Sequence, residues 1–143
     1  MPKLRTMYVI KEYTPCPTKE NDEIFPNGVF HFNISNIVKD IYSGKLLVYE
    51  ENINVKEWFC SHLHSTALDE NHLPTVDIER PIIQAEIRPN FFSIIDGNHR
   101  IEKAYRTGVP SIRSYKIVGE QLIPYIITTH GYRTFVEYWN SKL

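Results

Sequence analysis

Cysteine is scarce in this sequence. Its 143 residues include two cysteines, Cys16 and Cys60, and these are too far apart to form a Cys-x-x-Cys pair. A disulfide-stapled scaffold needs several paired cysteines, and cysteine-rich zinc sites need closely spaced ones. The sequence therefore argues against both classes of protein and predicts reduced thiols.

Long apolar runs are also missing. No apolar stretch approaches the roughly 18 residues that a membrane-spanning helix needs. The first residues, MPKLRTMYVIKEY, contain neither the apolar segment nor the cleavage site of a secretion signal. We therefore expect a cytoplasmic protein without a membrane partner.

The sequence also lacks an excess of charge of either sign. Sixteen Lys and Arg residues stand against seventeen Asp and Glu, so the formal net charge is −1 at pH 7. The whole chain thus lacks the basic character of many nucleic-acid-binding domains, although a local basic patch is compatible with it. The length and the 42% apolar share suit a single domain, residues 1–143, with one core.

Apolar spacing and turn residues predict an alternation of helices and strands. Asn33 or Ser35 is expected to cap a first helix, and Asn54 a second one. The predicted helices cover residues 34–43, 55–68, 98–107 and 133–141, and the predicted strands 8–13, 46–50, 81–87, 91–95 and 111–118. Residues 14–28 are expected to form a loop, and residues 120–129 are ambiguous. The expected fold class is α+β, a small mixed sheet with flanking helices.

The most distinctive stretch is DGNHR, residues 96–100, between a predicted strand and a predicted helix. Gly97 permits a sharp turn and a close backbone approach to a ligand. The free N–H groups of a helix N-terminus favour an anion, and His99 and Arg100 add further donors. Asp96 could cap the helix, orient a neighbour or hold Mg²⁺. The alternative is an ordinary turn and cap, with Arg100 paired on the surface.

The pattern around this stretch, RPIIQAEIRPNFFSIIDGNHRIEKAYRTGVPSIRSYKI, resembles the core of the ParB/sulfiredoxin-like superfamily, also called the ParB-like nuclease fold. The shared features are a hairpin, a D-G-x-H-R turn, a helix, a glycine and a strand over residues 81–118, about a quarter of the chain. The superfamily includes DNA-partitioning proteins that hydrolyse CTP, sulfiredoxins that use ATP and free-serine kinases. Because one fold hosts several activities, the resemblance alone does not choose among them.

In those proteins the turn cradles nucleotide phosphates. The resemblance therefore implies that ATP or CTP binds to this chain through Gly97, Asn98, His99 and Arg100. Lys103, one helical turn further on, could reach a phosphate or only water. Asp96 would hold Mg²⁺ or, with His99 and Glu86, serve catalysis as an acid–base group.

Two departures from the family pattern narrow the choice. Sulfiredoxins carry a nucleophilic cysteine at the position of Asn98, and an amide cannot form the sulfur intermediate, so sulfiredoxin activity is not expected. The 25 residues after Val118 are too few for the helix-turn-helix and dimerisation modules of partitioning proteins. The DGH-[TS]-R form of the serine kinases is near DGNHR but not identical to it.

Two other groups of polar residues are candidates for a functional role. Gln84 and Glu86 share one face of a predicted strand, which indicates a solvated face more than a general base or metal ligand. Cys60, His62, His64 and His72 are close in sequence, but His62 and His64 would point apart on a helix, which argues against a shared metal ion.

Three functions are left open. The first is nucleotide binding, with Mg²⁺-dependent NTPase or phosphotransferase activity as its enzymatic form. The second is a DNA-associated nuclease or binding module, because arginines and Lys103 gather around the turn. The third is a non-catalytic regulatory protein that keeps the fold. The resemblance favours the first, and whether the chain is an enzyme is left open.

Overall fold

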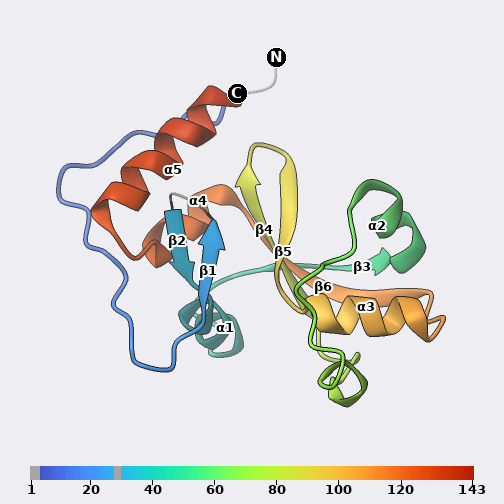
Figure 1. Ribbon diagram of the computed structural model, residues 1–143. Coiled ribbons are helices and arrows are strands. Elements are labelled where there is room, and N and C mark those ends of the chain that lie inside the picture. Colours follow the sequence, from blue (N-terminus) through green and yellow to red (C-terminus); the bar gives the residue numbers. More distant parts are fainter. Residues whose placement is uncertain (1–3, 28–29) are drawn as a thin grey trace. The chain divides into compact units, whose positions relative to one another are not determined.

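The computed structural model describes residues 4–27 and 30–143 and shows an α+β arrangement of short strands and helices (Figure 1). The elements in chain order are β1 (Ile24–Asn27), β2 (Phe30–Asn33), α1 (Ile34–Tyr42), β3 (Tyr49–Asn54), α2 (Val55–Ser61), η1 (Leu73–Thr75), β4 (Ile82–Arg88), β5 (Phe91–Asp96), α3 (Asn98–Arg106), β6 (Ser111–Ile117), α4 (Gly119–Leu122), η2 (Ile123–Tyr125) and α5 (Thr129–Ser141). The α+β class expected from the sequence is confirmed. Among the helices described, none is both long and apolar enough to cross a membrane.

The chain divides into two compact units. The first takes in the residues up to Leu47, Ala85–Ser93 and Ile117–Leu143, and the second takes in Val48–Gln84 and Ile94–Lys116. The expectation of a single domain stays a prediction.

Two sheets contain the strands. In the first unit β1 and β2 form an antiparallel hairpin in which Phe25 lies opposite Phe32. The larger sheet has the strand order β3-β6-β4-β5, and β3 runs antiparallel to β6 with Ile53 opposite Ile112. A predicted strand at residues 46–50 is displaced, because the strand begins at Tyr49.

The core of the first unit forms between α5 and β2. Phe30 of β2 meets Phe135 of α5 edge to face, with ring centroids 5.2 Å apart. Tyr132, Phe135 and Trp139 are buried on the same face of α5, as the helical spacing predicts. The helix begins at Thr129 rather than 133, since the Thr128 side chain caps it by accepting from the Gly131 N–H.

The N-terminal segment runs along α5 as an extended chain, not as the strand expected at residues 8–13 (Figure 1). Its backbone groups bond to helix side chains. Asn140 accepts from the Met7 N–H at 2.9 Å and donates to the Met7 carbonyl at 2.8 Å. The Ile10 N–H donates to the Tyr132 hydroxyl at 2.7 Å. The strand prediction was wrong because these partners are side chains far away in sequence.

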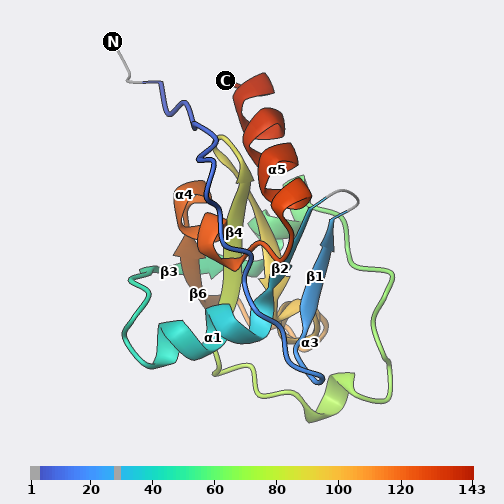
Figure 2. The same cartoon turned by 90° about the vertical axis from the view of Figure 1, so that its left-hand side faces the viewer.

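Helix α1 follows directly on β2, as Figure 2 shows, and it begins at the predicted cap, Asn33. The Asn33 side chain accepts from the Asn36 N–H at 3.0 Å and donates to Asp22 at 2.8 Å and to the Pro17 carbonyl at 3.2 Å. It is completely buried. The predicted loop before it is partly wrong, because Ile24–Asn27 form β1, and its residue 28 lies outside the described residues.

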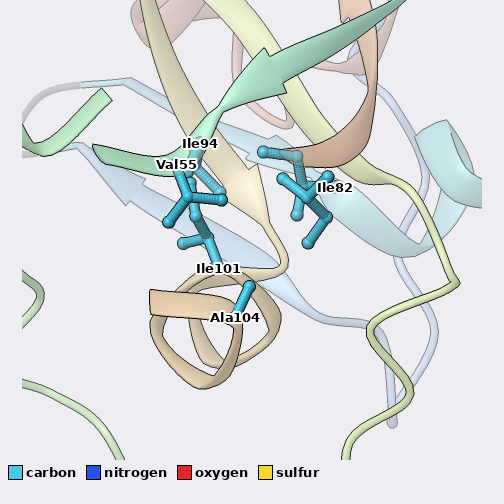
Figure 3. Packing of buried hydrophobic residues seen from close by; sticks show 6 residues of the cluster. Val55, Ile82, Ile94, Ile101 and Ala104 are labelled. Carbon is cyan, nitrogen blue, oxygen red and sulfur yellow. The ribbon is translucent and has the colours of Figure 1, made fainter. Parts of the chain in front are cut away.

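The second unit has its own apolar cluster, which Figure 3 shows from close by. Side chains from α2, β4, β5, α3 and β6 meet there. Full burial of a large apolar side chain stabilises the folded state by about 1.5–3 kcal/mol. The cluster consists of Val55, Ile82, Ile94, Ile101, Ala104 and Ile112.

Helix α2 ends at Ser61, seven residues before the predicted end. The His62 backbone is extended, its ring stacks on Trp58 with centroids 3.6 Å apart, and its Nδ1 lies 3.0 Å from the Trp58 carbonyl oxygen. A continuing helix would have used that carbonyl for the backbone N–H of residue 62, so a local side-chain bond replaces the next turn. Leu63, which the predicted helix included, is 96% exposed.

The two asparagine caps allow a matched stability test. Asn54→Ala removes one capping bond at an exposed position and should lower the free energy of unfolding by about 1 kcal/mol. Asn33→Ala removes three bonds of a completely buried amide, those to the Asn36 N–H, Asp22 and the Pro17 carbonyl, so its cost should be about 2–3 kcal/mol. Urea denaturation followed by circular dichroism measures both; equal losses would contradict the role given to Asn33.

Candidate functional site

The turn at Gly97 joins β5 to α3 within the second unit. Its φ is +106°, a left-handed conformation that side chains disfavour. A β-carbon at this position would lie 2.7 Å from Cγ2 of Ile82 and 2.8 Å from Nη2 of Arg100. Glycine is therefore required twice, by the backbone conformation and by the close approach of these two side chains.

The N-terminus of α3 carries no side-chain cap. The first helical backbone bond runs from the Ile101 N–H to the Gly97 carbonyl, at 3.1 Å. The N–H groups of Asn98, His99 and Arg100 precede it and have no acceptor within the helix. Together with the helix dipole, these groups favour a negative charge at the turn.

Arg100 lies under the turn instead of pairing on the surface. Its side chain is 9% exposed, and its Nη2 donates to the Pro81 carbonyl at 3.0 Å and to Asp96 Oδ2 at 3.3 Å. Arg100 therefore does pair with a carboxylate, as the alternative interpretation of the turn had it, but the guanidinium is buried. Its Nε is buried and has no hydrogen-bond partner among the described residues. A buried donor without an acceptor costs about 1–3 kcal/mol.

His99 and Lys103 hold a neighbouring segment of the chain. His99 Nε2 accepts from the Asp69 N–H at 3.0 Å, so the ring carries its proton on Nδ1 in this state. Lys103 Nζ donates to the Pro74 carbonyl at 2.9 Å and to the Val76 carbonyl at 2.8 Å. Both residues, predicted to contact phosphates, thus tie the segment 69–76 to α3.

Arg106 extends this face of α3 by one more turn. It donates to Glu70 at 2.6 and 3.0 Å and, as the i, i+4 spacing predicts, to Glu102 at 3.1 Å. Docking of the turn-rich segment before β4 on this face could not be predicted from the sequence, because the segment contributes mainly backbone groups to the contacts. The side chains that hold it occupy the i, i+4 and i, i+3 positions 99, 103 and 106.

Glu86, the other candidate catalytic group, belongs to the first unit and is 1% exposed. It accepts from Arg5 at 2.6 and 2.8 Å, from the Asn90 N–H at 2.7 Å and from the Gly119 N–H at 3.1 Å. Burial raises the pKa of Glu86, but the Arg5 guanidinium and the two backbone N–H groups outweigh it and lower the pKa below its usual value.

The expectation of a solvated strand face at Gln84 and Glu86 was wrong. Gln84, in the second unit, is 1% exposed and donates from Nε2 to the Ser114 hydroxyl at 2.7 Å. Gln84 and Glu86 are alternate residues of β4, as the sequence predicts. Their burial depends on distant partners, and neither carboxylate oxygen of Glu86 is left without a donor.

The histidines near Cys60 have separate surroundings. His62 lies on Trp58, His72 meets His99 edge to face, and His64 Nδ1 lies 2.6 Å from Glu102. The helix-geometry argument against a shared metal does not apply, because α2 ends at Ser61. Across residues 4–27 and 30–143, no group of three or more His, Cys, Asp and Glu side chains is arranged to hold a metal ion.

Comparison with known proteins found no matching family model, no similar curated protein and no similar solved structure.

The ion pair of Glu86 predicts a pH-dependent stability. Because its pKa is lower in the folded chain than in the unfolded chain, the stabilisation is present above about pH 4.5 and is lost as the pH falls through the folded value. Glu86→Gln should cost about 2–3 kcal/mol at pH 7, and the gap to the unsubstituted protein should narrow toward pH 3.

Glu120 offers the matched control, because it pairs with the same Arg5 from a side chain that is 47% exposed. Glu120→Gln should cost no more than about 1 kcal/mol. Urea unfolding at pH 7, 5 and 3 measures both variants. A Glu86→Gln loss that equals the Glu120→Gln loss, or one that is constant with pH, would contradict the assignment.

Proposed function

We propose that the turn at residues 96–100 binds the phosphate groups of a nucleoside triphosphate, ATP or CTP. The observation that carries the proposal is the buried, unpartnered Nε of Arg100 beside the uncapped start of α3. An anionic oxygen is the acceptor that satisfies such donors, and the dipole at the start of α3 favours the same charge. The resemblance to the ParB/sulfiredoxin-like superfamily adds the nucleotide as the source of the phosphate.

The position of Asp96 is a reason to propose that the nucleotide binds as its Mg²⁺ complex. Mg²⁺ keeps several waters and takes one or two carboxylates together with phosphate oxygens. Asp96 fits as a single carboxylate, since it lies in the turn itself and Arg100 contacts one of its oxygens at 3.3 Å. Arg100 and Asp96 together would then meet a phosphate and its metal from the same side of the turn.

Binding is better supported than turnover. The groups proposed for proton transfer, His99 and Glu86, are both engaged, one by the Asp69 N–H and the other by four donors. A catalytic role would require these bonds to be exchanged. We therefore propose a nucleotide-binding protein, with a non-catalytic regulatory role ahead of NTPase or phosphotransferase activity.

The charges of the second unit support nucleic-acid binding less well than nucleotide binding. Two arginines of that unit are paired with carboxylates: Arg106 with Glu70 at 2.6 Å, and Arg113 with Glu50 at 2.6 Å. Lys103 is bound to two backbone carbonyls. A phosphate backbone binds through unpaired Lys and Arg side chains, and the release of its counterions depends on them.

Asn98 allows binding to be separated from stability. It is the first residue of α3 and is exposed, so Asn98→Asp adds a negative charge where the helix dipole favours it. The free protein should be stabilised by about 0.3–1 kcal/mol, whereas phosphate binding should weaken because the new charge repels it. The matched control is Asn52→Asp, the same change at an exposed position of β3.

A thermal-shift panel of ATP, CTP and inorganic phosphate, each with and without Mg²⁺, measures the effect. The unsubstituted protein and Asn52→Asp should gain thermal stability with a nucleotide and Mg²⁺, whereas Asn98→Asp should respond less although it starts from a higher Tm. No response of the unsubstituted protein to any nucleotide, or an equal response of Asn98→Asp, would overturn the proposal. Phosphate release in the same samples reports turnover.

A further inference from the structure

A short segment of the second unit is fastened to α3 mainly by polar bonds. Residues 69–76, called the strap from here on, include η1, which lies against α3 (Figure 1). Leu73 is buried, whereas the rest of the strap is exposed or half-buried. A segment that buries little apolar surface opens at a lower free-energy cost than the core does. The strap is therefore a part of this unit that can leave α3 while the core stays folded.

The bond at the start of α3 uses a group that the proposed phosphate site needs. His99 Nε2 accepts from the Asp69 N–H at 3.0 Å, and His72 of the strap meets the His99 ring edge to face, with centroids 5.0 Å apart. An ionised phosphate oxygen only accepts, so Nε2 can meet it only as a donor. One nitrogen cannot accept from the strap and donate to a phosphate at the same time. The docked strap and a phosphate bound at this nitrogen therefore exclude each other.

Two further contacts hold the strap without excluding a ligand. Lys103 Nζ donates to the carbonyls of Pro74 and Val76, and because an ammonium group has three N–H donors, these bonds leave one for a ligand. Arg106 pairs with Glu70 at 2.6 Å between side chains that are both exposed, and such pairs stabilise little. The strap is thus held by several small contributions, of which the His99 bond is the one in competition with phosphate.

Arg100 gives an independent reason for a movement at this site. Its Nε is buried and has no acceptor among the described residues. A ligand oxygen reaches a buried atom only after a covering group moves away, and the strap is bonded to the adjacent residue, His99. Glu70 of the strap is close enough to His99 for their charges to interact. The docked strap therefore also sets a negative charge beside the proposed anion site, where it opposes a phosphate.

We propose that the strap is a gate of the nucleotide site, closed when it is docked on α3 and released when the nucleotide phosphates bind. This inference rests on the phosphate binding proposed at residues 96–100. In the closed state His99 Nε2 accepts from the strap, and in the open state it donates to a phosphate oxygen. Because the open state is the one that binds, the apparent affinity is reduced by the fraction of molecules that are closed.

Amide hydrogen exchange followed by NMR tests the release in the full chain. With saturating ATP or CTP and Mg²⁺, the Asp69 N–H should exchange at least about fivefold faster, because it loses its acceptor. The Ile101 N–H, which is bonded to the Gly97 carbonyl within α3, should not exchange faster. A ligand that merely stabilises the fold slows exchange, so faster exchange at Asp69 is specific to release of the strap.

Two variants break the same strap contact with opposite changes of charge. Glu70→Gln and Arg106→Gln should each speed exchange of the Asp69 N–H about two- to fivefold in the free protein. The matched control is Glu50→Gln, which breaks the pair with Arg113, also exposed and 2.6 Å long, and should leave this exchange unchanged. Effects of opposite sign in the two strap variants would be effects of charge alone and would overturn the inference.

Leu73→Ala weakens the closed state without a change of charge. It should bind the nucleotide at least about twofold more tightly than the unsubstituted protein, and equal or weaker binding would overturn the gate. Nucleotide binding that leaves exchange of the Asp69 N–H unchanged or slower overturns the gate alone and leaves the phosphate proposal standing. Absence of binding in both the unsubstituted protein and Leu73→Ala overturns the phosphate proposal and the gate with it.

Discussion

At Gly97 the chain leaves β5 with a φ of +106°. A β-carbon at this position would lie only 2.7 Å from the Ile82 side chain. The arrangement of α3 in the second unit depends on this close turn. It lets Ile101 enter the apolar cluster and brings the Arg100 guanidinium under the carbonyl of Pro81. Because Gly97 has no side chain, it cannot cap α3. The turn that places α3 therefore also leaves the first N–H groups of the helix without a side-chain acceptor.

Helix α3 has a core-facing side and an outward side, because positions three and four apart share a face. Ile101 and Ala104 pack into the core. His99 and Lys103, with Arg106 one turn on, fasten the segment 69–76. Glu102 is directed at His64.

Local signals in the sequence predicted what depends on neighbouring residues. Asn33 caps α1 and Gly97 makes the turn because both effects act within a few positions of the chain. The sequence could not show that Glu86 is buried, because its partner Arg5 is 81 positions away. It also placed His99 in the turn without showing that its ring bonds to the Asp69 N–H, since side-chain direction is settled by tertiary packing.

The most direct measurement of the central claim is a titration of ¹⁵N-labelled protein with ATP and Mg²⁺, followed by two-dimensional NMR. The account predicts that the largest shifts fall on the backbone amides of Asn98, His99 and Arg100 and on the Arg100 Nε–H, which gains an acceptor. Saturation by nucleotide with these four signals unmoved, or no shift anywhere, would contradict it.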